Sequence, residues 1–416
     1  MLTPAQRFRS ENAPPSPDEP AARASRHTAA LRGAPMHRVR DPIHGFIDLT
    51  PVEAALVETR PVQRLRRVKQ LGLTHLVYPG AEHSRFVHSL GACHVAGLLA
   101  SALVRAGWTG DPRLARVGAL LHDLGHPPFS HAGERGVPHE DMTLALVRGG
   151  EIADVLRAHD LDPDAIAATV AGTGDPVACA LVSGQLDADR MDYLLRDARM
   201  CGVRYGEYDL PRLVESVVPA PDGGLAVRGA GLHAAEGLLL ARYSMFQQVY
   251  FHRTRRVLDL LLEEVLPDWP SDPEAFLDWD DGRALELLRV DPRPAARAIW
   301  ERRIPVCVAE LEISADPAQR IEADAIAARL GDVLGAAPRV DSSARMVTFR
   351  PSGDIPILEA DGRTRSVFAA SPVLRRMDPH VEVRRIYVDR AHADQARAEV
   401  ATLRGNAVQL RLFTSR

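Results

Sequence analysis

The chain has 416 residues, which is enough for one large helical domain and a smaller lobe. Its composition, 46% apolar and 25% charged, is typical of a soluble globular protein. The formal net charge of −4 provides no global positive field, so a nucleic-acid partner and a nuclease activity are disfavoured.

Residues 1–35 are rich in Pro, Ala and Arg without helical periodicity, and we expect a disordered tail. The alternating run 37–50, with Pro42 and Gly45, predicts a short hairpin. From 51 to about 304 the pattern is mostly helical. The predicted helices are 85–107, 114–124, 140–149, 151–158, 163–171, 187–200 and 232–266, with a second small hairpin at 219–229.

The sequence pattern changes after residue 304 from mostly helical to a mixture of strands and helices. Strands are predicted at 305–313, 345–351, 366–370 and 384–390, and a helix at 316–335. We therefore expect a mainly α protein with small β-hairpins, divided into a tail (1–35), a helical domain (36–304) and a smaller α+β C-terminal lobe (305–416).

Three features bear on the cellular compartment. The N-terminus lacks the apolar run of a signal peptide, and no stretch approaches 18 apolar residues, so we expect no membrane partner. The four cysteines are Cys93, Cys179, Cys201 and Cys307. They show no CxxC spacing, which favours reduced thiols and a cytoplasmic protein.

The run HDLGHPPFSH, from His122 to His131, is the most informative stretch. Seven of the sixteen histidines fall between His83 and His139, far more than an even spread would give. The adjacent His122 and Asp123, predicted to lie in a helix, can approach one metal ion from two directions. The later histidines of the run then become candidate proton donors.

A second cluster, AEHSRFVHSLG, lies upstream. Arg85 and His88 are three residues apart and share one face of the predicted helix. A metal ligand beside a guanidinium group is what a phosphate needs, because the ion polarises one oxygen while arginine holds others.

A third cluster, QLDADRMDYLLRD, lies downstream. Asp189, Tyr193 and Asp197 are four residues apart and form one stripe of a helix. Spacing does not choose between Asp187, Asp189 and Asp192 as a metal ligand, and Asp187 or Asp189 could instead cap the helix.

Arg242 and Tyr250 are eight residues apart on the long predicted helix and could hold a phosphate and stack on a base. The sequence contains neither GxxxxGK[ST] nor GxGxxG, so it offers no phosphate cradle of those kinds.

Taken together, these motifs resemble the HD-domain deoxynucleoside triphosphate (dNTP) triphosphohydrolases. The similarity runs from about Val39 to Val306 and includes, in the family's order, DPIHGFIDL, QRLRRVKQLG, GAEHSRFVHSLG, ALLHDLGHPPFSH, PHE and QLDADRMDYLLRD. The lobe after residue 305 matches only in general character. The resemblance implies that the helical domain is an HD-domain core.

The resemblance also implies roles for individual residues. The implied ligands of one divalent metal ion (Mn, Fe, Mg or Zn) are His88, His122, Asp123 and Asp189. The implied catalytic group is His126, His131 and Glu134, supported by His139 and Glu140. The implied phosphate contacts are Arg85, Arg190, Tyr193 and Arg242, and the implied sugar and base contacts are Gln70, Leu71, Asp197 and Tyr250.

Nucleotide-regulated members of the family bind an activating nucleotide at subunit interfaces. Gln63, Arg66 and Arg212 match some of those positions. The resemblance therefore implies an allosteric nucleotide and a homo-oligomer, either a dimer or a tetramer.

The expected function is metal-dependent hydrolysis of (deoxy)nucleoside triphosphates by attack of metal hydroxide at the α-phosphorus, which releases nucleoside and tripolyphosphate. Two alternatives use the same residues. One is a phosphatase of nucleoside monophosphates or other small phosphate esters. The other is a nucleotide-binding regulator without turnover.

Overall fold

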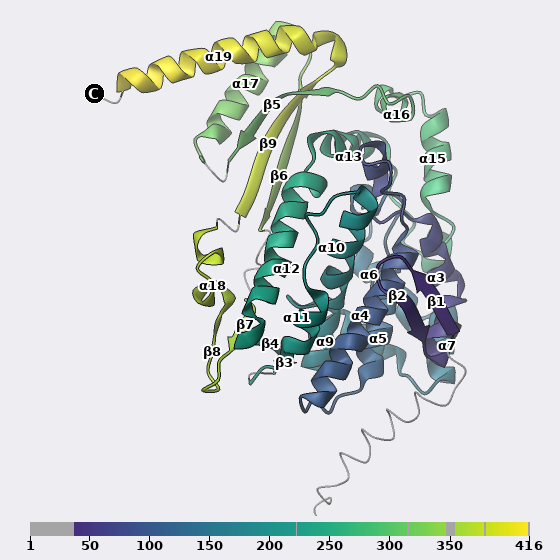
Figure 1. The fold of residues 1–416 in the computed structure, drawn as a ribbon. Coiled ribbons are helices and arrows are strands. Elements are labelled where there is room, and N and C mark those ends of the chain that lie inside the picture. The colour runs from purple at the N-terminus through teal and green to yellow at the C-terminus, as the bar shows by residue number, and fades with distance from the viewer. Residues whose placement is uncertain (1–36, 222, 314–315, 347–353, 378–379, 415–416) are drawn as a thin grey trace, which may run out of the picture.

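The computed structural model describes residues 37–221, 223–313, 316–346, 354–377 and 380–414. The predicted tail at 1–35 lies outside these residues. Helices dominate the described chain and only small sheets accompany them (Figure 1). The predicted mainly α fold is therefore confirmed.

The first hairpin is present as predicted, with β1 (His37–Asp41) antiparallel to β2 (Gly45–Leu49). Asp41 closes its turn, because Oδ1 accepts hydrogen bonds from the backbone N–H groups of Ile43 (2.8 Å) and His44 (2.9 Å). This turn brings His44 against the helical core, where its Nε2 lies 2.6 Å from Asp192 Oδ1.

The central helix α4 (Arg85–Arg105) packs against α5 (Pro112–Leu121) and α10 (Ala188–Cys201). Among the described residues, α4 is the one helix long and apolar enough to cross a membrane, although the sequence pattern predicted no such stretch. In the fold 72% of its apolar window is buried, as in the core helix of a globular domain.

Shorter helices surround α4 and complete two large apolar cores. Four of the helices in this domain begin with an Asp-Pro pair, in which the aspartate caps backbone N–H groups and proline occupies a position that needs no donor. Besides α12 (Leu232–Met245) and α13 (Arg253–Val265), the other α-helices of the domain are α2 (Pro51–Val57), α3 (Arg60–Arg64), α6 (His139–Arg148), α7 (Gly150–Ala158), α8 (Pro163–Val170), α9 (Pro176–Ser183), α11 (Leu210–Ser216), α14 (Pro273–Phe276), α15 (Asp281–Val290) and α16 (Pro294–Trp300).

The helix predicted at 232–266 is wrong as a single element. The chain forms α12 (Leu232–Met245), a π-helical turn (Phe246–Tyr250) and α13 (Arg253–Val265). His252 starts α13, because its ring nitrogen accepts a hydrogen bond from the backbone N–H of Thr254 (3.2 Å). The break places Tyr250 on a turn rather than on a continuous helix face.

The helix predicted at 114–124 also ends early. α5 stops at Leu121, and His122 and Asp123 lie in the tight turn that follows. The hydroxyl of Thr143 stabilises this turn, because it donates to the carbonyl of His122 (3.2 Å) and accepts from the N–H of Gly125 (2.9 Å).

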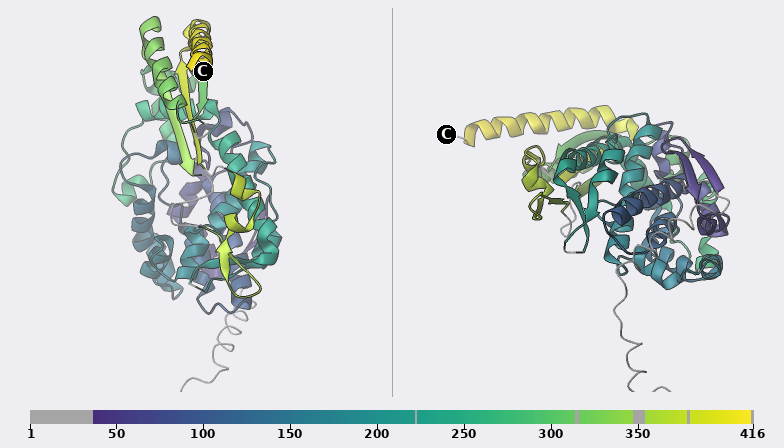
Figure 2. Two further views of the ribbon diagram at one scale, coloured as in Figure 1. Left: turned by 90° about the vertical axis from the view of Figure 1, so that its left-hand side faces the viewer. Right: turned by 60° about the horizontal axis from the view of Figure 1, so that its bottom comes forward.

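The C-terminal lobe contains a three-stranded antiparallel sheet in the order β5 (Val306–Glu312), β9 (His380–Val388) and β6 (Arg339–Met346). Helices α17 (Gln319–Leu334) and α19 (Ala393–Thr414) pack with this sheet at one end of the helical domain (Figures 1 and 2). The predicted strands at 305–313 and 384–390 and the helix at 316–335 are found. Only the start of the strand predicted at 345–351 lies within the described chain.

A second sheet joins the two parts of the chain. Its order is β3 (Val217–Pro219), β4 (Leu225–Arg228), β7 (Pro356–Leu358) and β8 (Thr364–Ser366). The strand predicted at 366–370 is wrong, because Ser366 caps the short helix α18 (Val367–Ala370). Ile357 and Val367 are fully buried in the apolar core of the helical domain, so residues 355–377 return to it from the lobe.

Candidate active site

Three segments far apart in the sequence bring four side chains to one point. His88 comes from the first turn of α4, His122 and Asp123 from the turn after α5, and Asp189 from the first turn of α10. The Nε2 atom of His88 lies 3.0 Å from Asp189 Oδ1 and 3.7 Å from Asp123 Oδ2. The Nε2 atom of His122 lies 3.2 Å from Asp123 Oδ1 and 3.5 Å from Asp189 Oδ1.

The hydrogen bonds on the far side of each imidazole set its tautomer. The Nδ1 atom of His88 lies 2.8 Å from Asp192 Oδ2, and that of His122 lies 2.8 Å from the carbonyl of Ala119. Each Nδ1 therefore carries a proton, and each Nε2 faces the centre of the cluster, where it offers a lone pair to a cation whenever the imidazole is neutral. Both Nε2 atoms are buried and make no hydrogen bond within the described chain.

The electrostatics of this cluster favour a cation. Burial opposes a charge on His88, but Asp189 and Asp192 outweigh it and raise the pKa of His88 to about 10. Burial likewise opposes ionisation of Asp123, yet Arg85 and His122 hold the pKa of Asp123 well below its usual value. Two carboxylates and two lone-pair nitrogens form a donor set that suits a divalent ion such as Mn, Fe or Zn.

The three aspartates that spacing could not separate have different positions. Asp187 caps α10 by accepting a hydrogen bond from the N–H of Arg190 (2.7 Å). Asp189 faces the cluster. Asp192 lies behind His88 and also accepts two hydrogen bonds from Arg196, both 2.8 Å.

The predicted catalytic group forms a second cluster beside the first. The Nδ1 atom of His139 lies 2.9 Å from Glu134 Oε1 and 3.2 Å from Glu140 Oε2, and that of His131 lies 3.5 Å from Glu134 Oε2. Hydrogen bonds from His131 and His139 hold the pKa of Glu134 well below its usual value. His126 is buried and lies 3.3 Å from Asp123 Oδ1.

The three imidazoles of this second cluster do not suit a metal ion of their own. His126 and His139 are stacked with centroids 3.9 Å apart and planes 17° from parallel. An ion lies in the plane of each imidazole that binds it, and two nearly parallel, stacked rings cannot share one. Burial and the charge of Arg85 lower the pKa of His126 well below its usual value, which makes it a neutral hydrogen-bonding group.

Among the predicted phosphate contacts, Arg85 lies directly against the first cluster. Arg85 Nη1 lies 2.5 Å from Asp123 Oδ2, and Arg85 Nε donates to Ser130 Oγ (2.8 Å). Arg190 and Arg242 are buried. Their charges act on Tyr193, although burial dominates and raises the pKa of that phenol.

The predicted sugar and base contacts are Gln70, Leu71, Asp197 and Tyr250, and two of them are hydrogen-bonded to each other. Asp197 Oδ2 accepts a hydrogen bond from Tyr250 Oη (2.8 Å), and its Oδ1 lies 2.8 Å from His83 Nε2. The rings of Tyr193 and Tyr250 are 6.2 Å apart. Next to Leu71, the Oε1 atom of Gln70 is buried and accepts no hydrogen bond from the described chain, so it can serve a ligand hydroxyl.

The predicted regulatory residues lie elsewhere. Arg66 donates to Gln63 Oε1 (2.8 Å), whereas Arg212 on α11 donates to the carbonyl of Ala230 (3.0 Å). No hydrogen bond or ion pair joins Arg212 to the other two among the residues that the structure describes.

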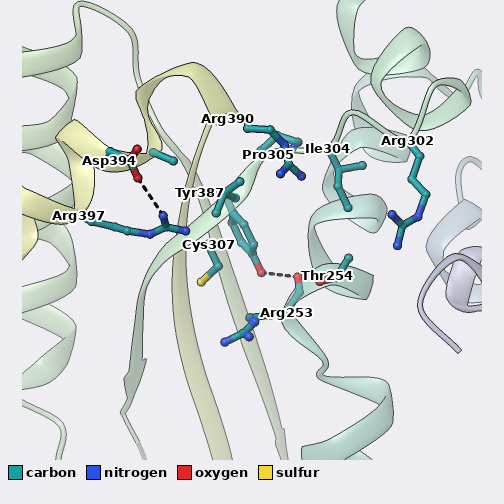
Figure 3. A pocket seen from close by; sticks show the side chains of 12 residues that line it. Arg253, Thr254, Arg302, Ile304, Pro305, Cys307, Tyr387, Arg390, Asp394 and Arg397 are labelled. Atoms are coloured by element: carbon teal, nitrogen blue, oxygen red, sulfur yellow. Dashed lines mark hydrogen bonds and ion pairs between the residues drawn. The ribbon is translucent and has the colours of Figure 1, made fainter.

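A cavity of about 700 Å³ lies between the start of α13 and the C-terminal lobe (Figure 3). It is lined by Arg253, Arg302, Arg390 and Arg397 together with Tyr387 and other residues. None of the predicted site residues lines it. The arginines of this cavity therefore belong to the junction between the two parts of the chain and not to the cluster of His88, His122, Asp123 and Asp189.

Several side chains that position this site were not assigned a role from the sequence. His44, Ser130 and Asp281 contact partners 45 to 212 residues away, and the partners of Arg64 include carbonyl oxygens 60 and 62 residues away. No spacing rule connects such positions. For His83 the only signal was its place in the histidine-rich window.

Comparison with protein-family models gives two matches. The HD domain model matches residues 85–195, the range that contains all four converging side chains, and the model of an HD associated region matches residues 208–325.

Individual relatives extend these matches. The uncharacterized protein YwfO of Bacillus subtilis is 40% identical over 236 residues, which are 55% of this chain and 54% of that protein. The deoxynucleoside triphosphate triphosphohydrolase SAMHD1 homolog of Dictyostelium discoideum is 27% identical over 334 residues, 71% of this chain and 64% of that protein. The chain thus spans less than two thirds of the length of either relative.

A solved structure covers more of the fold. A hypothetical protein from Aquifex aeolicus is 31% identical and superposes with a TM-score of 0.78, over 88% of this chain and 100% of that one.

Proposed function

Because this chain belongs to the HD-domain, dNTPase-like family, we propose that it is a metal-dependent phosphohydrolase that acts on (deoxy)nucleoside triphosphates. The observation that carries the proposal is the convergence of two imidazole lone pairs and two carboxylates beside Arg85. In the proposed reaction water adds to the α-phosphorus, the bond from phosphorus to the 5′-oxygen breaks, and the products are nucleoside and tripolyphosphate.

A divalent ion would be held by His88, His122, Asp123 and Asp189. When bound, such an ion supplies Lewis-acid polarisation of a phosphoryl oxygen and a lower pKa for water. The outer hydrogen bonds from Asp192 and the Ala119 carbonyl support this assignment, because they fix both imidazoles with Nε2 facing inward.

The chain's own groups supply the rest of the chemistry. Arg85 is held between Asp123 and Ser130 and can bridge to a phosphate oxygen. His126, neutral because of its lowered pKa, can donate a hydrogen bond to another. Burial lowers the pKa of His131, and Glu134, 3.5 Å away, opposes this shift; we assign His131 as the group that gives a proton to the departing 5′-oxygen.

Other side chains of the chain can bind the remaining phosphates and the sugar of the substrate. Arg190, Arg242 and the phenol of Tyr193 offer donors to a polyphosphate chain. The unpaired Gln70 Oε1 and the pair of Asp197 and Tyr250 offer contacts to a sugar. This number of arginines supports a triphosphate over a monophosphate substrate.

The proposal is tested by incubating the protein with each dNTP, Mn²⁺ or Mg²⁺, and water labelled with ¹⁸O, and then separating the products. We expect nucleoside and tripolyphosphate, with the label in tripolyphosphate. Release of orthophosphate from a dNTP would contradict attack at the α-phosphorus. Hydrolysis of dAMP but not dATP would favour the monophosphatase, and binding without turnover would favour a regulator.

The regulatory nucleotide at Gln63, Arg66 and Arg212 and the homo-oligomer stay predictions. Gel filtration with and without nucleotide tests both.

A further inference from the structure

The loop that carries the catalytic histidines has an unusual backbone. Phe129 and Ser130 follow the ligand pair and precede His131, and their φ angles are +62° and +57°. Two successive residues other than glycine rarely adopt the left-handed region, and they persist there only when surrounding contacts hold them. Phe129 is 1% exposed, so its ring is one such contact.

This loop is pressed against the turn that carries Gln70 and Leu71. A Cβ atom on Gly72 would lie 2.7 Å from the carbonyl oxygen of Phe129, so only glycine fits there. Ser130 Oγ donates to the carbonyl of Lys69 (2.6 Å) while accepting from Arg85. The catalytic loop and the predicted sugar-binding turn are therefore in direct contact.

Asp281 links these two segments from a third. It is the first residue of α15 and is 5% exposed. Its Oδ1 accepts the backbone N–H of Phe129 (2.8 Å) and its Oδ2 accepts that of Lys69 (2.9 Å). Each oxygen of one buried carboxylate thus serves a different loop of the site.

Arg64 makes the complementary set of contacts. Its fully buried guanidinium donates to the carbonyls of Leu124 (3.4 Å) and His126 (3.0 Å), just after the ligand pair. Its Nε donates to the carbonyl of Trp279 (2.7 Å), two residues before Asp281. The segment 279–281 is therefore connected to the catalytic loop twice. The Asp281 carboxylate binds the loop directly, and the Arg64 guanidinium bridges the Trp279 carbonyl and the carbonyls of the loop.

We propose that Asp281 is a positioning residue of the active site, which sets the distance between the catalytic loop at 124–131 and the substrate-binding turn at 69–71. The inference rests on the proposed function for its effect on catalysis. Asp281 itself contacts neither the proposed metal ligands nor the predicted substrate-binding side chains. It acts through the two backbone amides that it holds.

Asp281→Asn is the direct test. Asparagine offers one oxygen, and its amide group would face the second N–H and leave it unpaired. We expect kcat for the dNTP to fall by about 10–100-fold, because misplacing reacting groups by about 1 Å has such effects. Manganese content per chain, measured by mass spectrometry, should equal that of the wild type.

Asp280→Asn is the matched control. Asp280 is the neighbouring residue, caps the same helix by accepting from the N–H of Arg283 (3.1 Å) and pairs with Arg67 (2.5 Å). It has the same charge but touches neither loop. We expect its kcat to stay within about twofold of the wild type, since surface pairs contribute little.

Hydrogen exchange supplies a readout that does not need turnover. In Asp281→Asn, peptides covering 66–72 and 125–135 should exchange about tenfold faster than in Asp280→Asn, while α4 is unchanged. In the wild type the same peptides should be protected, a measurement that stands even if the variant fails to fold. Rapid wild-type exchange, unaltered exchange in Asp281→Asn, or faster exchange with normal kcat would each overturn the inference. A wild type without dNTP hydrolysis would instead refute the proposed function.

Discussion

Replacing Asp192 with asparagine tests whether its carboxylate orients the imidazole of His88, a proposed metal ligand. Asp192 is fully buried and accepts hydrogen bonds from His44 (2.6 Å), His88 (2.8 Å) and twice from Arg196. An amide can replace only part of this set, so His88 loses the partner that holds its proton on Nδ1.

Two free-energy changes follow from this replacement. Removing one partner of a buried ion pair costs about 3–5 kcal/mol. In the variant, Arg196 keeps Asp41 (2.8 Å) as its carboxylate partner, so we expect a cost near the lower end of this range. The free energy of unfolding of the metal-free protein should fall by about 3 kcal/mol. Loss of an outer-shell partner weakens metal binding by about 10–100-fold. That factor equals about 1.4–2.7 kcal/mol.

The assay separates these two effects. Urea unfolding of the metal-free protein gives the first, and titration with Mn²⁺ against a chelator gives the second. Glu53→Gln is the control, because Glu53 is a similarly buried carboxylate whose two oxygens pair with Arg116 at 2.6 Å, without contact to a predicted ligand. If both variants bind Mn²⁺ as tightly as the wild type, the orienting role of Asp192 is refuted.

Further predictions concern packing, pH and proton transfer. A Cβ added at Gly91 would lie 1.9 Å from Asp192 Oδ1, so Gly91→Ala should cost about 1–3 kcal/mol in urea unfolding. Gly237→Ala, where the nearest atom is 3.6 Å away, should be neutral or stabilising, and equal losses would contradict the packing argument. Burial raises the pKa of Asp281 to about 6 from an unfolded value near 3.9, so folding favours its protonated form and this contribution is lost as pH rises through 6. When the pH is lowered from 7.5 to 5, the free energy of unfolding of the wild type should therefore rise by about 1.4 kcal/mol relative to that of Asp281→Asn. Parallel curves of unfolding free energy against pH for the two proteins would contradict this prediction. His131→Ala should lower kcat by about 10²–10⁴-fold with normal manganese content, whereas full turnover would remove it as the acid.

The convergence of His88, His122, Asp123 and Asp189 could be predicted because these residues sit in short, recognisable motifs. Spacing alone left three aspartates of one motif open, since Asp187, Asp189 and Asp192 all lie within one and a half turns of a helix. The structure separates them by where α10 begins. Asp187 precedes the first turn and caps it, whereas Asp192 faces the opposite side of His88.

Other features left no pattern in the sequence. The apolar residues of 232–266 are compatible with one helix, and only the π-helical turn and the capping by His252 break it. Asp281 and Arg64 bind backbone atoms of distant loops, and a backbone partner imposes no side-chain type on its position. Such contacts become visible only when the segments are folded together.

The path of the chain between its two parts has a mechanical consequence. Residues 306–313 and 316–346 belong to the lobe, 355–377 lie in the helical domain, and 380–388 return as the middle strand of the lobe's sheet. The chain therefore passes between the lobe and the helical domain three times. Three connections restrict rotation of the lobe relative to the helical domain more than a single linker would. Deleting all residues after 304 would remove Ile355, Ile357 and Val367 from the apolar core of the larger domain. The deletion should therefore lower the free energy of unfolding of the helical domain that is left.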